Sequence, residues 1–428
     1  WVVSGKSEAA LRDQARRLHE HVTTNPDTPL AETGRSLALT RTHFPHRAGI
    51  TGTTREELLE ALDALARGTT HPGLVQGKTT DQGRLAFMFT GQGSQRPGMG
   101  HELYTTYPVY AETFDSICKE IDPHLPRPLH EAVFEDTELL RQTQYAQPAL
   151  FALQVSLYRL IKSWGITPDH LTGHSIGEIA AAHIAGVLTL TDATTLITTR
   201  ANLMQNLPTS GTMTAIQTGE TDLTPLLAPH TDRVAIAAVN GPRSTVISGD
   251  TDAIDSVLAQ LPPTIKTTRL NVSHAFHSPL MEPMLEEFRQ ALRKLTYHPP
   301  TIPIVSTLTG RHLTTEEITD PEHWINHARH TVRFHDALET LHGNDVTTYI
   351  EIGPDATLTT LAQAFNTTAT FIPTLRKNQP EPHTLTTTLT TLHTTTHHPI
   401  NWNTLYHPHT PTTPLPTYPF QRQRHWIN

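Results

Sequence analysis

The sequence predicts an α/β protein whose main body is interrupted by a smaller α+β piece. Residues 168–172 form a short strand pattern, and a Gly-Ser-Gly turn at Ser175 and a helical apolar stripe follow it. Between Gly211 and Val272 the pattern changes to the order β-α-β-β-α-β, which is the split βαβ of a ferredoxin-like subdomain. We therefore expect an α/β core that carries an inserted ferredoxin-like subdomain.

The first eighty residues predict a small N-terminal α/β unit. An apolar start at residues 1–3 precedes a helix whose apolar face is formed by Leu11, Ala15, Leu18 and Val22. Thr54 with Glu57 three residues later predicts a capping box at the start of a second helix. A polar stretch over 73–83 then leads to a strand at 85–89, which opens the main body.

The remaining elements follow from the same periodicities. In the inserted piece we expect strands at 213–217, 234–239, 245–248 and 266–271, with helices at 223–227 and 253–261. The main body resumes with a helix over 279–295 and strands at 304–306 and 349–352. Beyond about Arg376 the chain is rich in Thr, Pro and His, so it is expected to wrap rather than to fold independently. The predicted domains are 1–82, 83–210, 211–273, 274–376 and 377–428.

Composition narrows the function classes. Asp and Glu outnumber Lys and Arg by 41 to 32 and there is no basic block, which argues against nucleic-acid binding. Cys118 is the single cysteine, so an internal disulfide is excluded and a reducing, cytoplasmic location is expected. No apolar run reaches the ~18 residues of a membrane span. The start lacks a methionine or signal-peptide pattern, which suggests a piece of a larger protein.

Histidine is abundant, with 28 in the chain and many in the C-terminal quarter, as in residues 393–399. These histidines form either a metal site or a solvated, compositionally biased surface segment. We favour the solvated segment and expect no metal, because no acidic or cysteine ligand joins them at metal-site spacing.

The hexapeptide over 173–178, Gly-His-Ser-Ile-Gly-Glu, is the main candidate for chemistry. A serine flanked by glycines two residues away on each side is typical of a nucleophile on a strand-to-helix turn. The same pattern also occurs in ordinary tight turns. Ser175 is therefore a candidate nucleophile, and the residues around it must show whether it is catalytic.

His277 is the candidate base, because a serine hydroxyl needs a group that takes its proton. Ser278 can cap the following helix and Pro279 suits its first position. The positive end of that helix disfavours an imidazolium and keeps the ring neutral. Alternatively, His277 merely satisfies backbone groups of its loop.

Arg200 lies within an apolar helical stripe formed by Ala193, Leu196, Leu203 and Leu207. A buried cation needs an anion. The partner is either a protein carboxylate or a substrate carboxylate gripped by the planar guanidinium.

Residues 91–95, Gly-Gln-Gly-Ser-Gln, follow directly on the strand at 85–89. They do not form a dinucleotide fingerprint, because Arg96 stands where the third glycine would fall, and no phosphate-loop lysine follows. Their amides, with the amide of Ile176, are candidates for an oxyanion hole, with a simple turn as the alternative.

Five motifs in this order closely resemble the acyltransferase domains of modular type I polyketide synthases of the malonyl type: residues 89–95, 145–151, 173–178, 200–205 and 274–278. The resemblance implies an α/β-hydrolase-like acyltransferase core. It also covers the flanks: residues 1–82 look like the linker domain between ketosynthase and acyltransferase, and 415–422 look like the post-acyltransferase linker.

The resemblance implies a serine–histidine dyad without a third carboxylate, with Ser175 as nucleophile and His277 as general base and then acid. The amides of Gln92 and Ile176 would form the oxyanion hole. Arg200 would hold the free carboxylate of a malonyl-type group.

Further roles are carried over residue by residue. The histidine of the family is oriented by a backbone carbonyl, which here is expected near Arg333. Gln147, Asn240 and His174 match positions around the pocket. No permanently bound cofactor is implied; the reaction uses a CoA thioester and the phosphopantetheine of a partner carrier protein.

Two places indicate a malonyl rather than a methylmalonyl substrate. Members that take methylmalonyl tend to have glutamine after the nucleophile and Tyr-Ala-Ser-His before the base. Here these places hold Ile176 and the run from His274 through Phe276 to His277. The bulk of Phe276 would oppose an α-methyl group, although one methyl usually changes binding by only ~1–3 kcal/mol.

The expected reaction is a ping-pong transfer from malonyl-CoA to an acyl carrier protein, with an adjacent ketosynthase reached through the linkers and with no nucleic acid and no membrane as partners. The alternative is a serine hydrolase or thioesterase with the same Gly-x-Ser-x-Gly motif. The hydrolase order of serine, acid and histidine is not clearly met, and Arg200 has no hydrolase task. A docking scaffold with a vestigial site is a third, non-enzymatic hypothesis.

Overall fold

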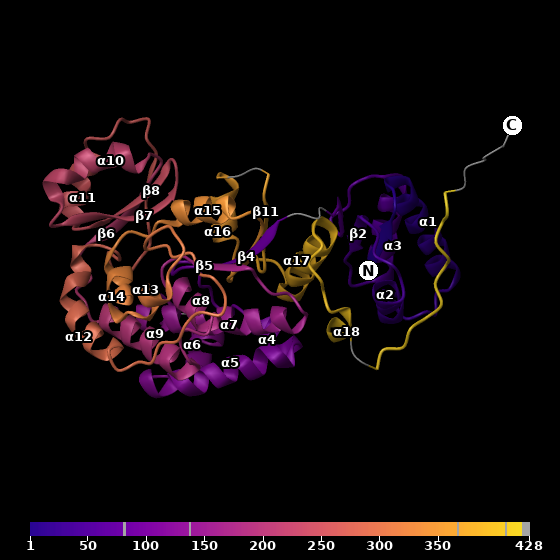
Figure 1. Ribbon diagram of the computed structural model, residues 1–428, viewed down its shortest axis with the longest axis horizontal. Coiled ribbons are helices and arrows are strands. Elements are labelled where there is room, and N and C mark those ends of the chain that lie inside the picture. Colours follow the sequence, from indigo (N-terminus) through magenta and orange to yellow (C-terminus); the bar gives the residue numbers. More distant parts are fainter. Residues whose placement is uncertain (80–82, 137, 366–367, 407–408, 422–428) are drawn as a thin grey trace. The chain divides into compact units, whose positions relative to one another are not determined.

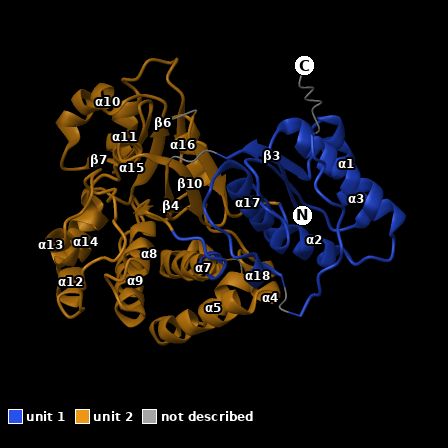
Figure 2. Cartoon of the chain, turned by 45° about the vertical axis from the view of Figure 1, so that its right-hand side comes forward, with its two compact units in different colours: residues 1–82, 161–167, 379–428 blue, residues 83–160, 168–378 orange. Residues whose placement is uncertain are grey.

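The computed structural model describes residues 1–79, 83–136, 138–365, 368–406 and 409–421. The chain forms two compact units (Figures 1 and 2). Unit 1 comprises Trp1–Gln82, Ile161–Thr167 and Gln379–Asn428, and unit 2 comprises Gly83–Leu160 and Pro168–Asn378. None of the described helices is both long and apolar enough to cross a bilayer.

Unit 1 is built on an antiparallel sheet in the order β1 (Val2–Gly5), β2 (His46–Ile50), β3 (Leu74–Lys78). Helices α1 (Glu8–Thr24) and α3 (Arg55–Arg67) bury apolar faces in one core with β2, and the face of α1 is the predicted one. The capping box at Thr54 is present.

The unpredicted α2 (Leu30–Leu39) completes this part of unit 1. It begins after Pro29 without a side-chain cap, so the usual sequence signal for a helix start is missing.

The C-terminal quarter contains a helix that the composition did not predict, α17 (Glu381–Thr395), followed by the short α18 (Trp402–Leu405). In α17, threonine hydroxyls donate to backbone carbonyls four residues earlier, as Thr388 does to Thr384. These local hydrogen bonds allow a threonine-rich helix to be buried. α17 packs on β2 and β3 at a glycine: a Cβ on Gly49 would lie 1.9 Å from Thr390 Cγ2.

The expectation of a solvated surface over 393–399 is therefore wrong for part of this segment. His393, Thr394 and Thr396 are buried, and His393 Nε2 lies 3.2 Å from His43 Nδ1. Burial first, and then the neighbouring His43 and Arg47, lower the pKa of His393 to about 2.

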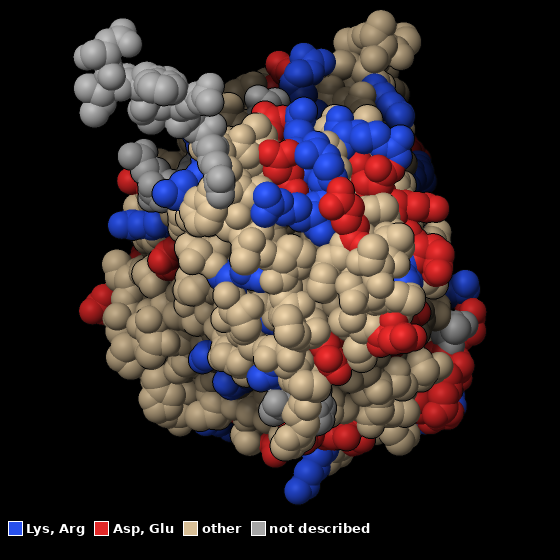
Figure 3. Space-filling model, turned by 90° about the vertical axis from the view of Figure 1, so that its right-hand side faces the viewer, with Lys and Arg blue, Asp and Glu red and all other residues tan. Residues whose placement is uncertain are grey.

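Residues 409–421 have no regular structure and run along unit 1, where Lys6 N donates to the Tyr418 hydroxyl at 2.9 Å. Arg422, the last residue of the predicted linker motif, lies outside the described residues. On the face of the molecule shown in Figure 3, basic side chains lie among acidic ones. On α1 such neighbours form ion pairs, including Arg16 with Asp13 at 2.5 Å.

Unit 2 contains a parallel four-stranded sheet in the order β11 (Thr370–Pro373), β10 (Val346–Ile352), β4 (Arg84–Phe89), β5 (His170–Gly173). Strand β4 is interior to the sheet and buried from Leu85 onward. The helices of this body are α4 (His101–Thr106), α5 (Pro108–Ile121), α6 (Leu129–Phe134), α7 (Thr143–Ser163), α8 (Gly177–Ile184), α9 (Leu190–Gln205), α12 (Glu282–Leu292), α13 (Thr315–Thr319), α14 (Pro321–Arg329), α15 (Phe334–Gly343) and α16 (Thr357–Gln363).

Two expected elements of this body differ in detail. The helix expected over 279–295 is a 3₁₀ turn, Pro279–Met281, followed by α12. The strand expected over 304–306 makes only isolated bridges, one of them between Leu171 and Ile304 beside β5.

The inserted subdomain forms an antiparallel sheet in the order β7 (Val234–Gly241), β8 (Ser244–Gly249), β6 (Thr212–Ile216), β9 (Thr267–Arg269). Helices α10 (Glu220–Leu227) and α11 (Thr251–Leu258) connect β6 to β7 and β8 to β9 (Figure 1). This is the predicted ferredoxin-like arrangement, and the predicted fold class is confirmed. β9 is shorter than expected and α11 ends at Leu258.

Candidate active site

Ser175 lies on a strained turn between β5 and α8, with φ of +50°. The turn is possible because both flanking glycines meet backbone: a Cβ on Gly173 would lie 2.2 Å from Glu178 N, and one on Gly177 would lie 2.3 Å from Phe89 O. A residue held at positive φ costs about 1–3 kcal/mol, so such turns are typical of functional sites. The turn places the serine hydroxyl at the start of a helix.

His277 contacts that hydroxyl, with Nε2 2.8 Å from Ser175 Oγ. Its Nδ1 lies 2.8 Å from the carbonyl oxygen of His330. Because a carbonyl can only accept, Nδ1 carries the proton and Nε2 is free to take the one from Ser175. Ser278 caps the following turn through Leu280 N, as the sequence predicts.

The orienting carbonyl was expected near Arg333, and the structure places it at His330 instead. The carbonyl of Arg333 accepts from Ala337 N at the start of α15, so it is already used. No sequence pattern points to His330, because a backbone carbonyl makes this contact and any side chain could accompany it.

Arg200 lies on α9 with only 2% of its surface exposed. Nη1 donates to Gln147 Oε1 at 2.7 Å and Nη2 donates to Ser175 Oγ at 3.4 Å. Among the described residues no carboxylate pairs with Arg200, and its Nε has no hydrogen-bond partner. Burial lowers the pKa of Arg200 to about 9, so the guanidinium remains charged at neutral pH.

A chain of side chains continues from Arg200. Gln147 Nε2 donates to Gln92 Oε1 at 3.0 Å, and Gln92 Nε2 donates to Thr143 Oγ1 at 3.3 Å. Since Arg200 can only donate, it orients the Gln147 amide with its oxygen toward the guanidinium. In the next two hydrogen bonds the donor is likewise the residue nearer to Arg200: Gln147 donates to Gln92, and Gln92 donates to Thr143.

The chain ends in the loop that carries the base. Thr143 Oγ1 lies 2.8 Å from Ser273 Oγ, and Ser273 Oγ lies 3.0 Å from His274 Nδ1. His274 Nε2 lies 3.0 Å from the carbonyl of Leu207 and donates to it. Thr143 and Ser273 were missed from the sequence, because single hydroxyls carry no pattern.

The remaining predicted residues surround the same turn. His174 Nε2 lies 3.0 Å from Asn240 Oδ1 on β7, and burial lowers the pKa of His174. The backbone amides of Gln92 and Ile176 donate no hydrogen bond to any described residue. Phe276 is buried next to His274, with ring centroids 6.0 Å apart.

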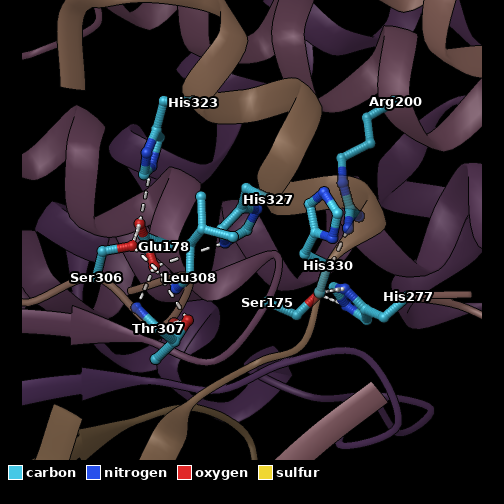
Figure 4. A network of polar contacts seen from close by, with 11 residues as sticks. Ser175, Glu178, Arg200, His277, Ser306, Thr307, Leu308, His323, His327 and His330 are labelled. Atoms are coloured by element: carbon cyan, nitrogen blue, oxygen red, sulfur yellow. Dashed lines mark hydrogen bonds and ion pairs between the residues drawn. The ribbon is translucent and has the colours of Figure 1, made fainter. Parts of the chain in front are cut away.

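A cavity of about 270 Å³ brings these residues together. Every residue predicted for the site lines it except His274, whose ring lies beside that of Phe276. No Asp or Glu of the described chain lines it; its apolar wall includes Met213, Val246, Leu270, Val272, Phe276 and Leu361. The arrangement presents a serine, a neutral imidazole and a cation that has no carboxylate partner among the described residues to one cavity. Figure 4 shows the side chains of Ser175, His277 and Arg200 close together.

Residues 86–399 match the family model described as the acyl transferase domain, and residues 1–62 match one described as CurL-like, PKS C-terminal. The chain is 44% identical over its full length to polyketide synthase GfsA of Streptomyces halstedii, covering 6% of that protein. It is 42% identical over its full length to mycoketide-CoA synthase of Mycobacterium tuberculosis, covering 10%. The chain thus spans only a small part of these curated relatives.

Solved structures give the same family. The acyltransferase domain of the second module of the salinomycin polyketide synthase has a TM-score of 0.81 and 44% identity, with 95% of this chain and 96% of that one covered. The acyl transferase domain of ZmaA has a TM-score of 0.89 and 28% identity, with 97% and 98% covered. MCAT from Streptococcus pneumoniae has a TM-score of 0.64 and 27% identity, with 72% and 99% covered. The chain belongs to the acyl transferase domain family and is an acyltransferase of the polyketide synthase type.

Proposed function

We propose that this acyltransferase moves a malonyl group from malonyl-CoA to the phosphopantetheine thiol of an acyl carrier protein. The observation that carries this proposal is Arg200, a buried charged guanidinium 3.4 Å from Ser175 Oγ with no carboxylate partner among the described residues. A buried cation without an anion is costly. An acyl group that ends in a carboxylate would supply that anion at the reacting serine.

In the first half-reaction Ser175 Oγ attacks the thioester carbonyl carbon while its proton passes to Nε2 of His277. The amides of Gln92 and Ile176, which have no other acceptor in the described chain, would hold the resulting oxyanion. Collapse of the intermediate breaks the carbon–sulfur bond. The CoA sulfur leaves with the proton from His277, and malonyl-Ser175 remains.

The second half-reaction runs in the opposite sense. The phosphopantetheine thiol gives its proton to His277 and attacks the ester carbonyl carbon. The bond to Ser175 Oγ then breaks and His277 returns the proton to the serine. The enzyme is regenerated and the carrier protein holds the malonyl thioester.

Malonyl rather than methylmalonyl specificity is part of the proposal. Phe276 lines the cavity and Ile176 follows the nucleophile, so both reduce the space beside the acyl α-carbon. A hydrophobic wall of this kind discriminates one methyl by ~1–3 kcal/mol. We therefore propose a preference that is strong but not absolute.

We also propose that residues 1–82 and 377–428 act as the linkers that join this domain to its neighbours, with a ketosynthase next to the first. The first segment and, from Gln379 onward, the second belong to unit 1, where Arg41 Nη2 donates to the Leu415 carbonyl at 2.8 Å. The match of residues 1–62 to the PKS C-terminal model supports this assignment.

The proposal is tested by the intact mass of the chain after exposure to malonyl-CoA, methylmalonyl-CoA or acetyl-CoA. We expect a malonyl adduct that is absent from Ser175→Ala. Arg200→Ala should load malonyl ~10- to 100-fold more slowly, since a hydrogen bond to a charged group contributes about 1.5–3 kcal/mol. Acetyl loading should not fall. Malonyl loading of Arg200→Ala at the parental rate would contradict the role of Arg200.

The fate of the acyl group distinguishes the proposed acyl transfer from the alternative, a serine hydrolase. His277 Nδ1 is bound to a carbonyl rather than to the acidic residue of a hydrolase triad. With a phosphopantetheinylated carrier protein present, we expect malonyl transfer to exceed release of free malonate. The reverse ratio would favour the hydrolase.

A further inference from the structure

Glu178 closes the hexapeptide of the nucleophile and has no task in the proposed reaction. It lies on α8 with 0% of its surface exposed. A buried carboxylate is costly unless several donors reach it. Glu178 lies three residues after Ser175, on the helix that follows the nucleophile's turn, so the groups that it binds are linked to the nucleophile.

Three donors bond to this carboxylate, and the Thr307 hydroxyl is shared between it and the Gly173 carbonyl, which lies 2.8 Å from that hydroxyl. Oε1 accepts from Ser306 Oγ at 2.6 Å and from His323 Nε2 at 3.1 Å. Oε2 accepts from the amide of Thr307 at 2.8 Å and lies 3.0 Å from the Thr307 hydroxyl. Burial by itself would raise the pKa of Glu178, but the neighbouring His327 and His323 outweigh it, and the net shift is downward. The group is therefore an anion at neutral pH.

These donors come from two segments that lead to the base. His323 lies on α14, which ends at Arg329, and the next residue is His330. The His330 amide closes the last turn of α14 on the Asn326 carbonyl at 2.8 Å, and the His330 carbonyl accepts from His277 Nδ1. Figure 4 shows Glu178 and its donors on one side, the Ser175 group on the other, and His327 between them.

The second segment leads to the same place. The carbonyl of Thr307 accepts from Arg333 N at 2.5 Å, just beyond His330. The Thr331 hydroxyl also donates to the Ile236 carbonyl on β7 at 2.7 Å. The His330 carbonyl is thus fixed from both directions, and Glu178 ties the nucleophile's helix to both segments.

We propose that Glu178 is a positioning residue: it fixes α14 and the 306–308 loop so that the His330 carbonyl holds His277 in the tautomer that accepts the Ser175 proton. The inference rests on the proposed Ser175–His277 dyad. If the carbonyl moved, the imidazole proton could occupy Nε2, and that tautomer cannot act as the base. Groups that orient a catalytic histidine commonly affect rate without touching substrate.

The decisive variant is Glu178→Gln, which keeps the size of the side chain but has only one acceptor oxygen. Single-turnover release of free CoA from malonyl-CoA measures acylation of the 428-residue chain. We expect acylation to slow by roughly 10²-fold, the usual cost of a small misplacement at a catalytic group. KM should stay unchanged, because Arg200 is held by α9 and Gln147.

Glu322→Gln is the matched control, because it makes the same change on α14 at a partly exposed contact with Arg289 that does not reach Glu178. It should acylate at the parental rate. His323→Phe keeps an aromatic ring, although a larger one, and removes one donor from Glu178. It should give a rate between those of the parent and Glu178→Gln. This second variant keeps the test decisive if Glu178→Gln folds poorly.

A double-mutant cycle separates positioning from general destabilisation. In a His277→Ala background, Glu178→Gln should cause no further loss of rate. An equal loss in both backgrounds, or parental acylation by Glu178→Gln, would overturn the inference. If Ser175→Ala and His277→Ala themselves acylated at the parental rate, the proposed function would fail; if only Glu178→Gln did so, the dyad would stand and this inference alone would fall.

Discussion

The base of the proposed dyad is a histidine buried beside a cation. Burial first, and then the charge of Arg200, lower the pKa of His277 well below its ordinary value, whereas the hydrogen bond to the His330 carbonyl raises it. The imidazole is therefore neutral when substrate arrives. It gains a proton only as Ser175 loses one, which confines the imidazolium to the transition state and the intermediate.

A pH prediction follows from the direction of this shift. Because the pKa of His277 is lowered, the acylation rate should not decline as pH falls through 6.5, and its acid limb should lie below that value. Removing the cation in Arg200→Ala should raise the pKa of His277 and move the limb to higher pH. Acetyl-CoA is the substrate for both proteins, since it does not need the guanidinium. The measurement is the pH profile of kcat/KM, and a limb that moved downward in the variant would contradict the assignment.

A second prediction concerns Phe276, which lines the cavity next to the base. Phe276→Ser should raise methylmalonyl loading relative to malonyl by ~10-fold or more, because relieving one methyl clash is worth ~1–3 kcal/mol. The measurement is the ratio of the two adducts by intact mass after competition between equal amounts of both CoA thioesters. An unchanged ratio would show that another wall of the cavity sets the preference.

At the scale of elements, the sequence was informative wherever a local rule applied. The glycines around Ser175 predicted the turn, and Thr54 with Glu57 predicted the start of α3. α17 was missed, because threonine lowers the local helix signal and the hydroxyl bonds that compensate are visible only in the structure. The carbonyl that holds His277 was expected near Arg333 and lies three residues earlier, at His330. Only the pairing with β7 and the start of α15 decide which carbonyl of this segment is free.

The strand–turn–helix element gives a stability prediction. Gly177→Ala places a Cβ 2.3 Å from Phe89 O and 2.8 Å from Thr90 O, and backbone atoms cannot move aside as a flexible side chain would. We expect unfolding of unit 2 to become easier by ~1–3 kcal/mol or more, as for other overpacked sites. Gly343→Ala is the control, because a Cβ there meets nothing within 4 Å. Denaturant titration followed by circular dichroism distinguishes them, and equal midpoints would contradict the prediction.

For the whole molecule, composition predicted the class of protein but not where its histidines lie. The chain has 28 histidines, and those at 393–399 read as a solvated tract. Contacts far apart in sequence bury His393 against His43, 350 positions away, so no local pattern could reveal it. Its ring also contacts Trp402, with centroids 5.2 Å apart. We predict that the burial of His393 also makes unit 1 sensitive to acid.

The sign of this sensitivity is fixed by the lowered pKa of His393, which is about 2 in the folded chain against an ordinary 6.5. Above pH 6.5 neither state binds the proton and there is no effect. Below it the unfolded chain binds a proton that the folded chain refuses, so the free energy of unfolding falls by up to ~1.4 kcal/mol per pH unit for this group. Urea unfolding of the chain at pH 7.5, 6.5 and 5.5, followed by tryptophan fluorescence, measures the slope. His393→Gln should reduce the slope, whereas the exposed His397→Gln should leave it at the parental value. A slope that did not change in His393→Gln would show that other buried histidines account for the acid sensitivity.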